Sequence, residues 1–209
     1  MSYRDQFIEA TRFTQSMGFA VPDLPSQSAE LVSPENGERV MHHVTNAGIP
    51  DLAPSALQCL KWSHALLPYV EAGLGCRVAL TVGRVSIGTR TVFDPTQADF
   101  ARWAITGVAA KDFVSRSGFN FHAWYTLPTM EILDLTLWST LAVAWDKPDM
   151  RGNVVGGWPD LIAPNPAFTP IVVGSSYFEH VHEISDVPLL SRGTSFKALS
   201  EIPMLLMRT

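Results

Sequence analysis

The hydrophobic pattern of this 209-residue chain changes its period once, near Gly75. Before that point, apolar residues recur at the spacing of amphipathic helices, over about residues 4–17, 34–46 and 57–74. From Cys76 onward, apolar and polar residues alternate, as in "CRVALTVGRV", which is typical of β-strands. A helical half followed by a strand-rich half favours the α+β class, with helices packed on an antiparallel sheet.

The length and the absence of a linker favour one domain over residues 1–209. We expect its helical part to cover about residues 1–75 and its sheet-rich part about residues 76–209. Local signals predict a helix that starts after Ser33 and a kink or break at Pro68. Further predicted elements are a helix opened by Asp94-Pro95, strands in "FNFHAWYTL", "EILDLTL", "PIVVG" and "YFEHVHEI", and a C-terminal helix.

Composition excludes several classes of partner. The formal charge is −5, with 15 Lys and Arg against 20 Asp and Glu, so the surplus of cations that nucleic-acid binding needs is missing. No uncharged apolar run approaches the roughly 18 residues of a membrane span, and the first residues lack the apolar stretch of a secretory signal. We therefore expect a cytoplasmic protein without nucleic-acid or membrane partners, while export as an effector and the oligomeric state stay open.

Two cysteines are too few for a disulfide framework, so each matters only as an individual thiol. Cys59 lies early in the predicted helix 57–74, where the positive end of the helix dipole favours the nucleophilic thiolate. Cys76 lies where the chain enters a strand, and we interpret it as a core residue. Cys59 is therefore the candidate nucleophile.

His122 and Asp134 lie on two segments that we expect to pair as a hairpin. If the turn is centred on Pro128, His122 faces Asp134 and Trp124 faces Ile132. Directly opposed residues have Cβ atoms about 4.5–5.5 Å apart, so the carboxylate can hold one imidazole nitrogen while the other serves a nucleophile. A one-residue slip would separate the two side chains onto opposite faces. The simpler alternative is a core cysteine beside a structural His–Asp pair.

These residues together resemble the transglutaminase-like branch of the papain-like cysteine enzymes. In that family a cysteine opens a helix that runs to a Leu-Gly step and a strand ending in Gly, here Cys59, Leu74-Gly75 and Gly83. A His-x-Trp and an Asp-x-Thr follow on neighbouring strands, here "HAW" from His122 and "DLT" from Asp134. The resemblance covers about residues 55 to 137, and "SALQC" and Thr126 depart from the family pattern.

The resemblance implies acyl transfer by a Cys59–His122–Asp134 triad that needs no cofactor, acting on an amide-bearing substrate such as a protein or peptide. Water as the acceptor would give a peptidase, amidase or glutamine deamidase, and an amine would give a crosslink. The N–H of Cys59 would be one oxyanion donor and Gln58 a second. Trp124 would pack over the site or line the acyl pocket, with simple core packing as its alternative.

Two other functions stay open from the sequence. One is a non-catalytic binding module that retains the transglutaminase-like fold. The other is a metal-dependent protein, because a strand over "EHVHE" would place His180 and His182 on one face at a spacing that can bind metal. An isolated pair of this kind is more often a solvated edge, so the predicted site contains no metal.

Overall fold

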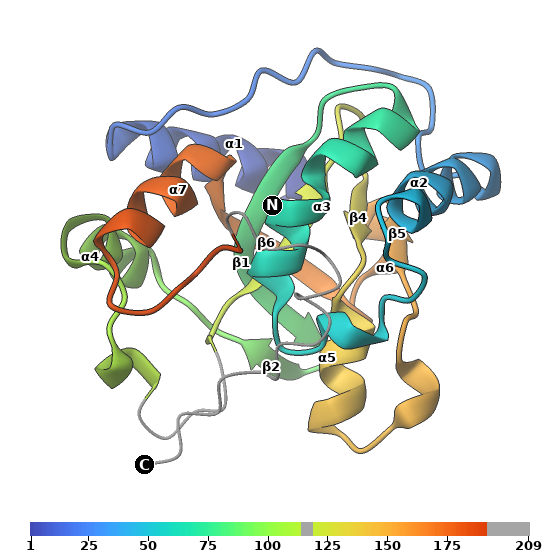
Figure 1. The fold of residues 1–209 in the computed structure, drawn as a ribbon. Coiled ribbons are helices and arrows are strands. Elements are labelled where there is room, and N and C mark those ends of the chain that lie inside the picture. Colours follow the sequence, from blue (N-terminus) through green and yellow to red (C-terminus); the bar gives the residue numbers. More distant parts are fainter. Residues whose placement is uncertain (114–118, 192–209) are drawn as a thin grey trace.

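The computed structural model describes residues 1–113 and 119–191. The fold is α+β, with helices packed against a sheet whose pairings are all antiparallel (Figure 1). The helices are α1 (Tyr3–Ser16), α2 (Pro34–Asn46), α3 (Cys59–Leu74), α4 (Gln97–Thr106), α5 (Leu137–Ala144), α6 (Pro159–Ile162) and α7 (Ser175–Ile184). The strands are β1 (Ala79–Ile87), β2 (Arg90–Phe93), β3 (His122–Thr126), β4 (Ile132–Asp134), β5 (Val155–Gly157) and β6 (Ala167–Val173).

The central strand of the sheet is β1, and both of its edges are occupied. One edge pairs with β6 over Thr81–Ser86. The first half of β1 also pairs with β3, and its last residues pair with β2. Because β6 overlaps both stretches, β2 and β3 must follow one another along the other edge. The end of β2 therefore meets the start of β3, and His122 is the first residue of β3.

The core lies on both faces of the sheet. One apolar cluster joins the sheet to α2, α3, α4 and α7, and the other joins it to α1 and α5. Neighbouring residues of β3 divide between them, with Ala123 and Tyr125 in the first and Trp124 in the second. This alternation is the period of two expected for a strand buried on both faces.

Close helix packing holds α3 in place. Gly73 lies against α2, and a Cβ at that position would stand 2.6 Å from the Cα of Val40. The predicted break at Pro68 is wrong, because α3 runs without interruption from Cys59 to Leu74. Contacts with β3 stabilise the helix there: the hydroxyl of Tyr125 donates to the carbonyl of Ser63 at 2.7 Å.

A buried polar network attaches α1 to the sheet. The indole Nε1 of Trp124 donates to the hydroxyl of Tyr3 at 2.8 Å, and that hydroxyl also lies 2.6 Å from Oγ1 of Thr126. The loop after α1 has its own anchor. The carboxylate of Glu131, which is fully buried, accepts the backbone N–H groups of Leu31 at 2.7 Å and Val32 at 3.1 Å.

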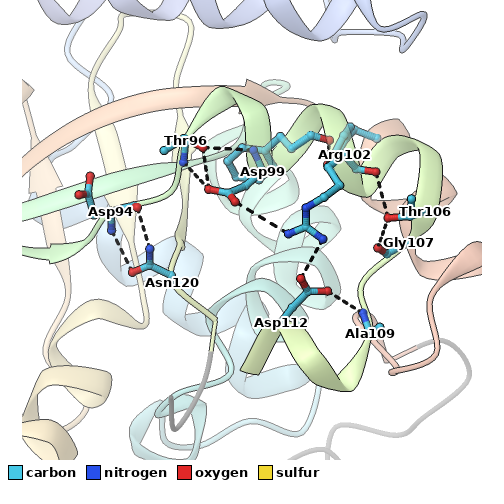
Figure 2. A network of polar contacts seen from close by, with 11 residues as sticks. Asp94, Thr96, Asp99, Arg102, Thr106, Gly107, Ala109, Asp112 and Asn120 are labelled. Atoms are coloured by element: carbon cyan, nitrogen blue, oxygen red, sulfur yellow. Dashed lines mark hydrogen bonds and ion pairs between the residues drawn. The ribbon is translucent and has the colours of Figure 1, made fainter. Parts of the chain in front are cut away.

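Two predicted elements, the start of α4 and the segment after Asp134, differ in the structure. The cap of α4 is Thr96, which forms a capping box with Asp99, and Asp94 lies outside the helix (Figure 2). The segment after Asp134 is not a strand but α5, because the Asp134 carboxylate accepts backbone N–H groups that a strand would direct sideways. The predicted C-terminal helix lies outside the described residues.

The segment "YFEHVHEI" was also predicted as a strand and is the helix α7. Its buried residues are Tyr177, Phe178 and Val181, whose spacing gives one helical stripe. That stripe packs toward α4, where the hydroxyl of Tyr177 donates to the carbonyl of Phe100 at 2.7 Å. In the part of the chain that the structure describes, no helix combines the length and the apolar character that crossing a membrane requires.

Candidate active site

Cys59 is the first residue of α3, two residues after the start expected for the helix over 57–74. Gln58 occupies the N-cap position and its carbonyl accepts the N–H of Trp62 at 3.1 Å, but no side chain caps the helix. The first backbone N–H groups of an α-helix have no partner within the helix. The thiol therefore lies beside donors that can stabilise negative charge, and it is 7% exposed.

His122 and Asp134 form a buried pair. Nε2 of His122 lies 2.7 Å from Oδ2 of Asp134, and neither side chain is exposed to solvent. The predicted pairing of these two residues is confirmed, but the predicted register is wrong by two positions. Tyr125 pairs with Leu133 and Thr126 with Ile132, so His122 and Asp134 meet diagonally rather than directly.

The cause of the register difference is a turn that lies one residue later in the chain than predicted. Met130 has a φ of 75° and its N–H donates to the carbonyl of Leu127 at 2.8 Å, which makes a three-residue loop with a left-handed last position. The pairing is therefore centred on Thr129 instead of Pro128. A shift of two residues preserves the face on which each side chain lies, so His122 and Asp134 still share one face.

The other oxygen of Asp134 is held by the start of α5. Oδ1 accepts the N–H of Thr136 at 2.9 Å, the hydroxyl of Thr136 at 3.2 Å and the N–H of Leu137 at 3.1 Å. These bonds fix the carboxylate while leaving Oδ2 for His122. Hydrogen bonds of this kind stabilise the charged form of a carboxylate.

The second nitrogen of His122, Nδ1, is buried and has no regular hydrogen-bond partner among the described residues. Burial alone would lower the pKa of His122, but the charges of Asp134 and Cys59 and the hydrogen bond to Asp134 raise it to about 10. Sγ of Cys59 lies 3.8 Å from the carbonyl oxygen of Phe121, the residue before His122. The structure thus places Asp134 on Nε2 of His122, and the thiol of Cys59 beside the residue that precedes His122 in the chain.

An aromatic ring covers the imidazole. Phe93, the last residue of β2, stacks on His122 with ring centroids 5.1 Å apart and an interplanar angle of 26°. Two reciprocal bonds join the segments that follow β2 and precede β3: the N–H of Asp94 donates to Oδ1 of Asn120 at 3.2 Å, and Nδ2 of Asn120 donates to the carbonyl of Asp94 at 2.7 Å (Figure 2). These contacts keep solvent away from the His122–Asp134 pair.

The two secondary site candidates have different surroundings. Trp124 is fully buried, donates to Tyr3 and packs edge-on against Phe168 at a centroid distance of 5.0 Å. These are the contacts of a core residue, in agreement with the alternative given for Trp124. Gln58 is adjacent to Cys59 at the start of α3. Its role as an oxyanion donor stays a prediction.

The remaining histidine candidates lie elsewhere. His180 and His182 belong to a helix, where residues two apart point in different directions, so the strand geometry predicted for a metal pair is absent. His180 contacts the carbonyl of Ala104, and Nδ1 of His182 accepts the N–H of Leu189. In the described part of the chain, no cluster of three or more metal-ligating side chains occurs.

Comparisons with family models, with curated proteins and with solved structures gave no match to this chain. The function is therefore inferred from the geometry of Cys59, His122 and Asp134.

Sequence reasoning missed three residues around this site. Phe93 and Asn120 act through contacts between segments distant in sequence, and no local pattern indicates them. Thr140 carried a signal, because Ser139-Thr140 is a polar pair inside the apolar run "LWSTLAVA". Both hydroxyl side chains are buried in α5, and both bond to the loop that precedes Cys59.

Proposed function

We propose that this protein is a cysteine-dependent acyl-transfer enzyme of the transglutaminase-like type that acts on amides. The observation that supports this most strongly is the buried arrangement of Cys59 at the start of α3, His122 beside it, and Asp134 on the far nitrogen of the ring at 2.7 Å. A nucleophile, a base and a group that orients the base are the parts that nucleophilic catalysis needs.

Each residue has a defined part in this reaction. The Cys59 thiolate attacks the carbonyl carbon, and an S–C bond forms. Nδ1 of His122 gives its proton to the nitrogen of the leaving amine as the C–N bond breaks, and a thioester remains. Asp134 holds Nε2 and stabilises the imidazolium. A water molecule then loses a proton to Nδ1 and attacks the thioester, which releases the carboxylic acid and restores the thiolate. The N–H of Cys59 stabilises the oxyanion in both steps.

One observation favours a second candidate, a non-catalytic module with the same fold. His122 and Asp134 are both fully buried and Cys59 is 7% exposed, as in a structural cluster inside a core. In that case alkylating reagents would modify Cys59 no faster than an ordinary thiol of the same exposure.

Cys76 supplies an internal control for the test. It is more exposed than Cys59, and burial together with the charge of Glu71 raises the pKa of its thiol. Iodoacetamide is added to the native protein at pH 7, and the alkylation of each cysteine is followed by peptide mass spectrometry. An unperturbed thiol is about 3% thiolate at pH 7, so a stable Cys59 thiolate should react about 30-fold faster than such a thiol.

The matched variant is His122→Gln, with folding checked by near-UV circular dichroism. The wild type should be alkylated at Cys59 first and should release a burst of 4-nitrophenol from 4-nitrophenyl acetate. The variant should show neither property. Ammonia release from a glutamine-containing peptide, with and without a fluorescent amine, then separates hydrolysis from transfer. Equal labelling of Cys59 in the folded wild type and the folded variant, with no burst, would contradict catalysis and favour the binding module.

A further inference from the structure

The loop that leads into α3 holds a non-glycine residue in a strained conformation. Leu57, two residues before Cys59, has a φ of 61°, which lies in the left-handed region. For a residue with a branched side chain, this conformation is unfavourable by about 1 kcal/mol and persists only where other contacts impose it. The dihedral angles of Leu57 set the direction in which the chain enters the helix, and therefore the orientation of the first helical residues.

One side chain supplies the contact at this point. The N–H of Leu57 donates to Oγ1 of Thr140 at 3.0 Å, and Thr140 is 3% exposed. This bond therefore fixes the backbone two residues before the first residue of α3.

Thr140 belongs to the same short segment as Asp134. Oδ1 of Asp134 accepts the N–H of Leu137, the first residue of α5, and the N–H of Thr140 donates to the carbonyl of Thr136 at 3.0 Å within the first turn. The carboxylate of Asp134 thus bonds the start of α5, and the hydroxyl of Thr140, within α5, bonds the loop before Cys59.

We infer that Thr140 is a positioning residue: its hydroxyl holds Leu57 in the left-handed conformation and so directs Cys59 toward His122. This inference rests on the proposed function, because positioning has a measurable effect only if Cys59 and His122 act together. A displacement of about 1 Å in a reacting group can lower a rate by about 100-fold. Loss of the hydroxyl should therefore lower the reactivity of Cys59 by about 10- to 100-fold.

The test compares three variants. Thr140→Val removes the hydroxyl and keeps the shape, whereas Thr140→Ser keeps the hydroxyl. Ser139→Ala is the matched control, since the hydroxyl of Ser139 donates to the carbonyl of Leu52 at 3.2 Å and accepts the N–H of Gly152 at 2.9 Å. Ser139 anchors the same loop farther from Cys59, and its replacement removes two hydrogen bonds rather than one. The rate of Cys59 alkylation is measured from pH 5 to pH 10, together with the thermal midpoint of each variant.

The expected result is a lower rate and a shifted pH profile for Thr140→Val, with a wild-type profile for Thr140→Ser. Ser139→Ala should be less stable and keep the wild-type profile. If Thr140→Val also keeps that profile, the positioning role is wrong while the proposed function stands. If Ser139→Ala and Thr140→Val change the profile equally, the effect is a general one of loop stability and the inference fails. If wild-type Cys59 does not depend on His122, the proposed function fails and the positioning role fails with it.

Discussion

Asp134→Asn tests the central pair most directly, because the substitution preserves shape and removes charge. An asparagine can keep the three contacts that Oδ1 accepts from Thr136 and Leu137, so the turn into α5 should survive. The loss is confined to the 2.7 Å contact with His122. A hydrogen bond to a charged group contributes about 1.5–3 kcal/mol, so we expect the free energy of unfolding at pH 7 to fall by about 2–3 kcal/mol. For a domain of this size that corresponds to a drop in Tm of about 5–10 °C.

The same substitution changes the protonation of His122. Without the carboxylate, burial dominates and lowers the pKa of the imidazole, so the ring is neutral at pH 7. The amide nitrogen at position 134 then presents a donor to Nε2, which moves the ring proton to Nδ1, the nitrogen that serves Cys59 in the proposed reaction. A protonated neutral Nδ1 cannot accept the thiol proton. The rate of Cys59 alkylation at pH 7 should fall toward that of an ordinary thiol, a decrease of about 30-fold.

Urea titration and iodoacetamide labelling at pH 7 measure the two effects on the same preparations. The control is Asp94→Asn, which removes an exposed carboxylate that lies 2.6 Å from Nε of Arg84. An exposed ion pair contributes less than about 1 kcal/mol, so this variant should be nearly as stable as the wild type and should label Cys59 at the wild-type rate. The reasoning is refuted if folded Asp134→Asn retains wild-type labelling, or if both variants lose equal stability.

Three further predictions concern the pair and the two polar anchors. His122 has a pKa of about 10 in the folded protein against an ordinary value of 6.5, so its contribution to stability is complete below pH 6.5 and is lost as the pH rises toward 10. In urea titrations across this range, the free energy of unfolding of the wild type should decline with pH, and His122→Gln should reduce that decline. An equal decline in both proteins would contradict this prediction. Glu131→Ala leaves the N–H groups of Leu31 and Val32 without an acceptor, so the free energy of unfolding should fall by at least about 2 kcal/mol. The Leu31 amide should also exchange faster with deuterium. Unchanged exchange at Leu31 would show that the carboxylate is not the anchor. Tyr3→Phe keeps the ring and deprives the Trp124 indole of its acceptor, which should remove about 1–3 kcal/mol in urea titration, and a wild-type midpoint would count against the network.

Much of the site could be predicted because its signals are local. Cys59 was placed at a helix start from the apolar spacing of residues 57–74, and the structure begins α3 at that residue. His122 and Asp134 were placed on one face of a hairpin from a turn assumed to be centred on Pro128. The register was wrong by two residues, but an even shift keeps both side chains on the same face of the sheet.

The errors occurred where a local pattern fitted two structures. Aromatic and β-branched residues in "YFEHVHEI" favour a strand, but Tyr177 and Val181 also stand one helical turn apart and pack toward α4. In "EILDLTL" the apolar alternation continues past Asp134, while the carboxylate binds the next N–H groups and starts α5. Tertiary packing outweighed the intrinsic strand preference in the first segment, and the side-chain bonds of Asp134 outweighed it in the second.

The α+β class, the helix that carries Cys59 and the shared face of His122 and Asp134 could be predicted from the sequence, because periodicity and helix position are properties of neighbouring residues. The left-handed turn at Met130 that sets the register and the stacking of Phe93 on His122 depend on tertiary packing. The bond from Leu57 to Thr140, across 83 residues of chain, depends on it as well. These contacts join segments far apart in sequence, so their energies depend on how the whole chain packs and leave no periodic signal in any single segment.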